Sequence, residues 1–128
     1  MEQKIRSKAR RVFGKGKVSA AFELGGEYVL SQIQQINALA ERSYQTAIRR
    51  GKTSENLSHI DTMFGIFDEL TEFRAASEHS PSTHIPQYTE AQEELADIII
   101  ACFTELHRRG VDVEKIITDK IKFNETRK

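Results

Sequence analysis

Apolar residues recur at intervals of three and four along most of the chain after residue 26, the period of helices that bury one face. The first such helix is predicted from Glu27 to about Arg50, with these apolar positions: Val29, Ile33, Ile36, Ala40, Tyr44, Ala47 and Ile48. A second is predicted to begin near Ser54 or Ser58 and to end at about Ser77. Its residues expected to face inward are Ile60, Phe64, Phe67, Leu70 and Phe73. No segment reads convincingly as a strand.

Capping residues and glycines mark where the helices begin and end. Gly51 is expected to stop the first helix, since glycine readily adopts the left-handed conformation of a helix C-terminus. Thr89 opens a third helix with Gln92 three positions later, the spacing of a capping box, and Gly110 closes it. Asp112 is a cap for a fourth helix. Its residues expected to face inward are Val113, Ile116, Ile117 and Ile121.

The chain has the size and composition of one water-soluble helical domain. It has 128 residues, 38% of them hydrophobic and 30% charged, and both prolines lie in one predicted loop, EHSPSTHIPQY, residues 78–88. The sequence contains no visible internal repeat. We therefore predict an all-α fold, a four-helix bundle, in residues 27–128, preceded by a basic N-terminal arm in residues 1–26.

The single cysteine and the lack of long apolar runs indicate the cellular compartment in which the protein is expected. Cys102 has no partner in the chain, which excludes an intramolecular disulfide and favours a reducing environment. No run approaches the roughly 18 apolar residues of a membrane span, and the N-terminus lacks the apolar segment of a secretory signal. A cytoplasmic protein with no membrane segment is expected.

Positive charge is concentrated at the N-terminus, although the chain as a whole has no net charge. Residues 1–17 contain seven basic residues and one acid, so this segment carries +6. Such a segment binds nucleic acid or an acidic subunit, or is a solvated tail. Because no aromatic platform or nucleic-acid motif accompanies it, a tail or a subunit contact is favoured over nucleic acid.

Two pairs of acids, each spaced three residues apart, fall on the second and third predicted helices. Glu69 and Glu72 share one helix face, and Glu94 and Asp97 share another. Carboxylates this close to apolar segments repel one another and cost several kcal/mol each to desolvate unless a cation lies among them. Four oxygen donors without histidine or thiolate favour Mg²⁺, or Mn²⁺, over zinc or copper.

The alternative that these acids are ordinary solvated surface residues stays open. Such pairs are common on helix surfaces, and the spacing alone is weak evidence for a metal site. The histidines give no alternative site. His59, His79, His84 and His107 are scattered, and the sequence indicates solvated side chains for them. Tyr44, Phe64 and Tyr88 are candidates for stacking a base, but aromatic residues at helical spacing are more often part of a core.

The order of these motifs resembles the MazG-type all-α nucleoside triphosphate pyrophosphohydrolases, which include helical dUTPases and dCTPases. The resemblance runs from about Ile36 to Arg127. It rests on DELTE (68–72), EELAD (93–97), the turn RRGVDVEKI and the final KIKFNETR (120–127). One position departs from the family pattern, which begins with two glutamates, because this chain has Asp68 before Glu69.

The resemblance implies a function and a role for each matching residue. Glu69, Glu72, Glu94 and Asp97 would bind Mg²⁺, with Asp68, Glu69 and Glu72 as the catalytic group. The phosphates would be held by Lys120, Asn124 and Arg127, which at i, i+4 and i+7 are predicted to share a helix face. The protein would convert a nucleoside triphosphate to the monophosphate and pyrophosphate as a homodimer or homotetramer. The competing interpretation is a non-enzymatic helical module that binds nucleic acid or a partner through its basic arm.

Overall fold

The computed structural model describes the backbone of residues 26–128 and, among these, the side chains from residue 35 onward. The predicted basic arm therefore lies almost wholly outside the described residues. Residues Ile36–Lys128 form one compact unit, and the packing reported below is that of this unit.

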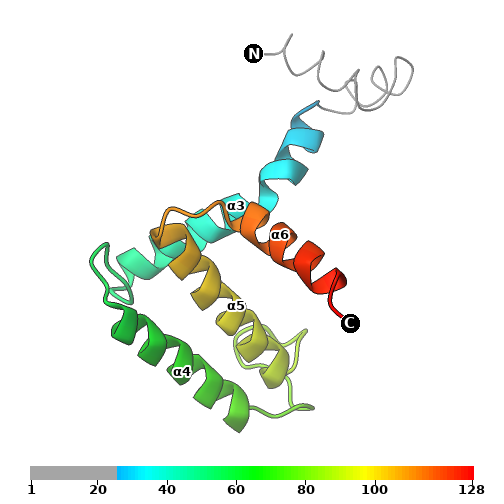
Figure 1. The fold of residues 1–128 in the computed structure, drawn as a ribbon. Coiled ribbons are helices and arrows are strands. Elements are labelled where there is room, and N and C mark those ends of the chain that lie inside the picture. The colour runs from blue at the N-terminus through cyan, green and yellow to red at the C-terminus, as the bar shows by residue number, and fades with distance from the viewer. Residues whose placement is uncertain (1–25) are drawn as a thin grey trace. The chain divides into compact units, whose positions relative to one another are not determined.

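The described residues contain four helices and no strand (Figure 1). The helices are α3 (Gly26–Arg49), α4 (His59–Ala75), α5 (Glu90–Arg108) and α6 (Val113–Glu125). The loop between α4 and α5 contributes one isolated antiparallel bridge, between Pro81 and Thr89. The all-α prediction is thus confirmed for this part of the chain, and the arrangement is compatible with a helical bundle.

The helix starts follow from the capping residues. Ser58, not Ser54, caps α4, and its hydroxyl accepts a hydrogen bond from the Asp61 amide at 3.1 Å. Thr89 and Gln92 form the predicted capping box of α5, each side chain accepting from the other's backbone N–H.

The helix ends follow from two glycines. Gly51 and Gly110 have φ values of 69° and 73°, the left-handed conformation that is strained for residues with a Cβ. Gly51 directs the chain from α3 back toward α4, and Gly110 turns it from α5 into the Asp112 cap of α6. Both positions bear out the predicted helix boundaries.

The helices of the compact unit are held together mainly around α5. Helix α4 lies alongside α5, and α6 also packs on α5 (Figure 1). Helix α3 reaches α5 through the rings of Tyr44 and His107, whose centroids are 5.1 Å apart. Asn37 joins α3 to the start of α6 by donating to the Asp112 carboxylate and accepting from the Glu114 amide, both at 3.1 Å.

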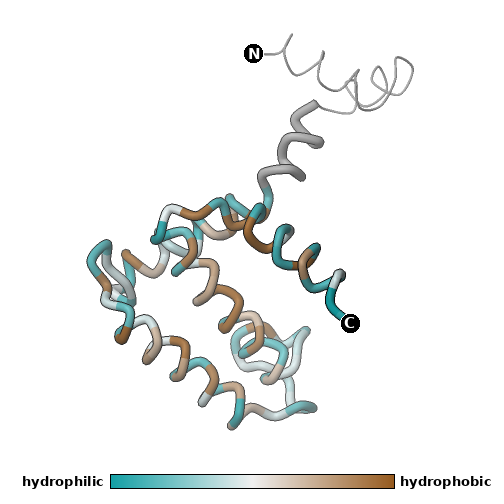
Figure 2. The backbone as a smooth tube through the Cα atoms, viewed as in Figure 1, coloured by the Kyte–Doolittle hydropathy of each residue, from teal (hydrophilic) through white to brown (hydrophobic). Residues whose placement is uncertain are grey.

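Burial of the apolar residues differs from the prediction. Ala40 and Val113 are the hydrophobic residues that are fully buried among the described side chains. Most of the residues predicted to face inward on α4 and α6 are exposed: Ile60, Phe64, Phe67, Leu70, Ile116 and Ile121. Figure 2 shows hydrophobic positions along both helices.

For α4, the face that it turns toward α5 is the physical reason for this difference. At 3.6 residues per turn, Ile60, Phe64 and Phe67 fall on the side of the helix opposite Glu69. Since Glu69 faces α5, these apolar residues lie on the outer side, where Ile60 is 59% and Phe64 58% exposed. The prediction of the helix was right, and the prediction that these residues are buried within the chain was wrong.

Cys102 lies half-buried on α5, and this burial raises the pKa of its thiol. A protonated thiol is a poor nucleophile. Between residues 26 and 128, no helix combines the length and the apolar character needed to cross a membrane.

Candidate metal centre

Three of the four predicted metal ligands converge where α4 lies against α5. Glu69 comes from α4, and Glu94 and Asp97 come from successive turns of α5. One carboxylate oxygen from each residue lies within 4.8 Å of the other two. All three side chains are partly buried. The two acid pairs, 22 residues apart along the chain, therefore do meet in space.

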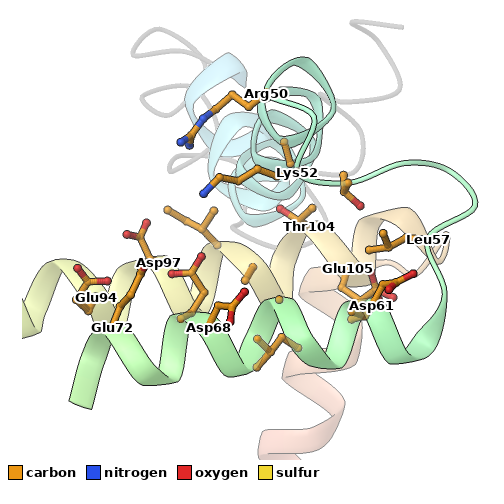
Figure 3. A pocket seen from close by; sticks show the side chains of 18 of the residues that line it. Arg50, Lys52, Leu57, Asp61, Asp68, Glu72, Glu94, Asp97, Thr104 and Glu105 are labelled. Carbon is orange, nitrogen blue, oxygen red and sulfur yellow. The ribbon is translucent and has the colours of Figure 1, made fainter. Parts of the chain in front are cut away.

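The other two predicted acids lie beside this triad. Glu72 is exposed, but its charge raises the pKa of both Glu69 and Glu94, in addition to the effect of burial, so its carboxylate is near them. Asp68 is also exposed and lines the same pocket (Figure 3). The pocket thus contains all five predicted acids, with three of them in direct proximity.

Concentrated negative charge makes the ionised triad unfavourable on its own. Burial is the main cause that raises the pKa of Glu69, Glu94 and Asp97, and the neighbouring carboxylates raise each pKa further. For Asp97 these neighbours are Glu93 and Glu72. A cation between the three oxygens would offset both the cost of burial and the repulsion between the carboxylates. It replaces the interaction that each carboxylate loses with water, and its charge opposes theirs.

The hydrogen bonding of Glu94 fits such a cation. Its Oε2 atom is buried and has no hydrogen-bond partner among the described residues. Buried acceptors are nearly always satisfied, so an unpartnered carboxylate oxygen beside two further carboxylates is available to a positive partner. Oxygen donors alone suit Mg²⁺ or Mn²⁺, which leave some coordination positions for water or phosphate.

Two cations that the sequence analysis missed face the acids. Arg50 and Lys52 follow the end of α3, line the pocket, and extend toward α4 and α5 (Figure 3). Burial raises the pKa of Asp97, and the charges of Lys52 and Arg50 partly oppose that rise. The basic run RRGK at positions 49–52 was visible in the sequence. Lys52 comes to the acids after the turn at Gly51, which was predicted from the sequence only as the end of a helix.

The pocket is large enough for a phosphate ester, at about 890 Å³. Glu105 also lines the pocket and is hydrogen-bonded to the arginines that follow it, Arg108 and Arg109. Burial acts to raise the pKa of Glu105, but hydrogen bonds from Arg108, Arg109 and Thr62 outweigh it and lower the pKa to about 2. Arg108 also donates to the Glu55 carbonyl at 3.3 Å, which ties the segment before α4 to the end of α5.

The predicted phosphate-binding residues lie elsewhere in the chain. Lys120 lines a separate apolar cavity of about 260 Å³ between α5 and α6, and its Nζ is 4.7 Å from the centroid of the Phe123 ring. Asn124 is on the same helix, but α6 ends at Glu125, so Arg127 does not share its face as predicted. None of the three lines the acidic pocket of its own chain.

Of the histidines and aromatic residues considered in the sequence analysis, His84 is the one that lines the pocket. Tyr44, Phe64 and Tyr88, the candidates for stacking a base, do not line it. His84 was expected to be a solvated loop residue, and no sequence signal places the loop over the acids.

No family model matches the chain, and searches of curated proteins and of solved structures found no match. A function for this site therefore has to be argued from its residues and geometry.

Proposed function

We propose that the protein is a Mg²⁺-dependent nucleoside triphosphate pyrophosphohydrolase, which converts an NTP or dNTP to the monophosphate and pyrophosphate. The observation that carries this proposal is the convergence of Glu69, Glu94 and Asp97 within 4.8 Å, with one Glu94 oxygen buried and unpartnered. The resemblance of the acid motifs to MazG-type enzymes supports the same activity. The lone Cys102 is in keeping with a cytoplasmic location.

The metal would be held by Glu69, Glu94 and Asp97, with Glu72 as a fourth ligand at the open side of the pocket. A divalent cation supplies Lewis acidity at a phosphate oxygen and lowers the pKa of a bound water. Mn²⁺ would serve in place of Mg²⁺, since both take carboxylate oxygens.

The remaining residues of the pocket would orient the water and the triphosphate. Asp68 is exposed beside the triad and is suited to hold a water and accept its proton. That water would attack the α phosphorus, the bond from this phosphorus to the oxygen that bridges the α and β phosphates would break, and pyrophosphate would leave with that oxygen. Because a triphosphate is strongly anionic, Arg50 and Lys52 opposite the acids would bind it and stabilise the leaving pyrophosphate.

We further propose that the active protein is a homodimer or homotetramer. The outer side of α4 exposes large apolar residues, and Ile99 of α5 is also 53% exposed. Large apolar side chains exposed on one side of a helix support an interface with a second copy. A second copy would also be needed to bring Lys120, Asn124 and Arg127 to a pocket, since they do not line that of their own chain.

The test is pyrophosphate release from a panel of ribo- and deoxynucleoside triphosphates with Mg²⁺. Activity should be lost in Glu72→Ala and in Asp97→Ala but retained in Glu78→Gln, an exposed loop acid outside the pocket. If no nucleotide is turned over, and if salt-dependent DNA binding vanishes on deletion of residues 1–17, the binding-module interpretation is correct instead.

A further inference from the structure

The loop between α4 and α5 is built around one buried serine. Ser82 is 1% exposed and accepts hydrogen bonds at 3.1 Å from the backbone amides of His84 and Ile85. Its hydroxyl donates to the Glu93 carboxylate on α5. These contacts hold His84 at a defined position above the start of α5.

Glu93 connects this serine to the His84 ring. While Oε2 of Glu93 accepts from Ser82, its Oε1 lies 2.8 Å from His84 Nδ1. A carboxylate accepts at this distance only from a protonated nitrogen, so Nδ1 carries hydrogen and the carboxylate orients the ring. Nε2 is then left for another partner. The His84 side chain is 79% exposed, whereas that of Glu93 is 17% exposed.

Several hydrogen bonds that do not involve the His84 side chain also hold the loop. The Ser82 amide donates to the Tyr88 carbonyl at 2.9 Å, and the Glu90 amide donates to the Ser80 carbonyl at 2.9 Å. The Ser77 amide also donates to the Glu90 carboxylate at 2.9 Å. An oriented and exposed histidine at the edge of a pocket, on a loop already fixed by other bonds, points to contact with a ligand.

We propose that His84 is a substrate-binding residue, oriented by Glu93 and Ser82, whose Nε2–H donates to a phosphate oxygen of the triphosphate in the acidic pocket. This inference rests on the proposed function, because the ligand it names is the substrate of that reaction.

A protonated His84 ring favours phosphate over a neutral ligand. The hydrogen bond with Glu93 is the main cause that raises the pKa of His84, and the charge of Glu93 adds to that rise. Protonation gives Nε2 the hydrogen that a phosphate oxygen accepts. His84 would thus add a cation on the loop side of the pocket, while Arg50 and Lys52 supply those on the α3 side.

The experiment compares His84→Gln and Glu93→Gln with the wild type, and uses His79→Gln as a matched control. His79 is an exposed histidine of the same loop that does not line the pocket. We expect His84→Gln to raise KM for the triphosphate about tenfold, as for the loss of one charge-assisted hydrogen bond, and to change kcat by less than about threefold. Glu93→Gln should change KM in the same direction by a smaller factor.

Two measurements without turnover separate a binding role from a structural one. Mn²⁺ affinity in the absence of nucleotide and the unfolding temperature should equal wild type in His84→Gln, while binding of a non-hydrolysable triphosphate analogue should weaken about tenfold. His79→Gln should match wild type in every measurement.

The inference is overturned if the wild type is active and His84→Gln has the wild-type KM and analogue affinity. It is also overturned if the KM of His84→Gln rises and its analogue affinity falls only together with a fall in the unfolding temperature. A wild type that hydrolyses no nucleotide refutes the proposed function, and this inference with it. The two failures are therefore distinguished by the activity of the wild type.

Discussion

Replacing Glu94 by glutamine should stabilise the metal-free protein and abolish its response to magnesium. The substitution keeps the size of the side chain but removes one of three charges whose oxygens lie within 4.8 Å of one another. Two of the three pairwise repulsions within the triad disappear, and the repulsion from Glu72 disappears with them. At this separation each repulsion is worth about 1 kcal/mol in water and about 3.5 kcal/mol at the effective dielectric constant of a protein site.

The side chains of the triad are partly exposed, so the lower figure is the better guide, and the net stabilisation should be about 2 kcal/mol. For a domain of this size that corresponds to an increase of about 8 °C in the unfolding temperature in EDTA at pH 7.5. The free energy of unfolding of the wild type, by contrast, should rise by about 2.7 kcal/mol when Mg²⁺ is present at 100 times its Kd. The free energy of unfolding of Glu94→Gln should hardly change when Mg²⁺ is added.

The pH dependence has a definite sign. Burial, followed by Glu72 and Asp97, raises the pKa of Glu94 in the folded state, so folding takes up a proton at pH values just above the usual carboxyl pKa. The metal-free wild type must therefore lose stability relative to Glu94→Gln as the pH rises from about 4 toward neutrality.

The assay is thermal unfolding followed by circular dichroism in EDTA and in MgCl₂, from pH 4.5 to 7.5, with Glu78→Gln as the control. The control should behave as wild type, since Glu78 is an exposed loop residue outside the pocket. A destabilised Glu94→Gln in EDTA, or one that keeps the wild-type response to Mg²⁺, would refute the reasoning that the three carboxylates share an ion.

Three further predictions concern stability and assembly. Glu105→Gln should destabilise the protein by about 2–3 kcal/mol at pH 7 in chemical denaturation. Because the folded pKa of Glu105 is lowered to about 2, the difference should shrink as the pH falls below 4.5. Asp112→Ala removes the α6 cap and the Asn37 contact and should cost about 1–2 kcal/mol, whereas an unchanged unfolding temperature would exclude a role for the cap. Phe64→Asp should convert the proposed oligomer to monomer in light scattering, while a monomeric wild type would contradict the proposed interface.

The helices were predictable because their ends depend on local chemistry. Ser58, Thr89 and Asp112 bond to amides three residues away, and Gly51 and Gly110 adopt a conformation strained for other residues. These interactions form between neighbours in the sequence, so they are visible without any tertiary information. The pairing of the acids was also predictable, because a three-residue spacing places two side chains on one helix face.

Which residues meet across the fold was decided by the packing of the helices. The apolar period of α4 is the same whichever way the helix is rotated, so it did not reveal that Phe64 faces outward while Glu69 faces α5. Lys52 and His84 join the acids only because a turn and a loop return them over the pocket, and the placement of Lys120 on the far side of α5 follows from the packing of α6. Local sequence specifies bonds between neighbours, whereas the rotation of each helix and the path of each loop minimise the free energy of the whole chain.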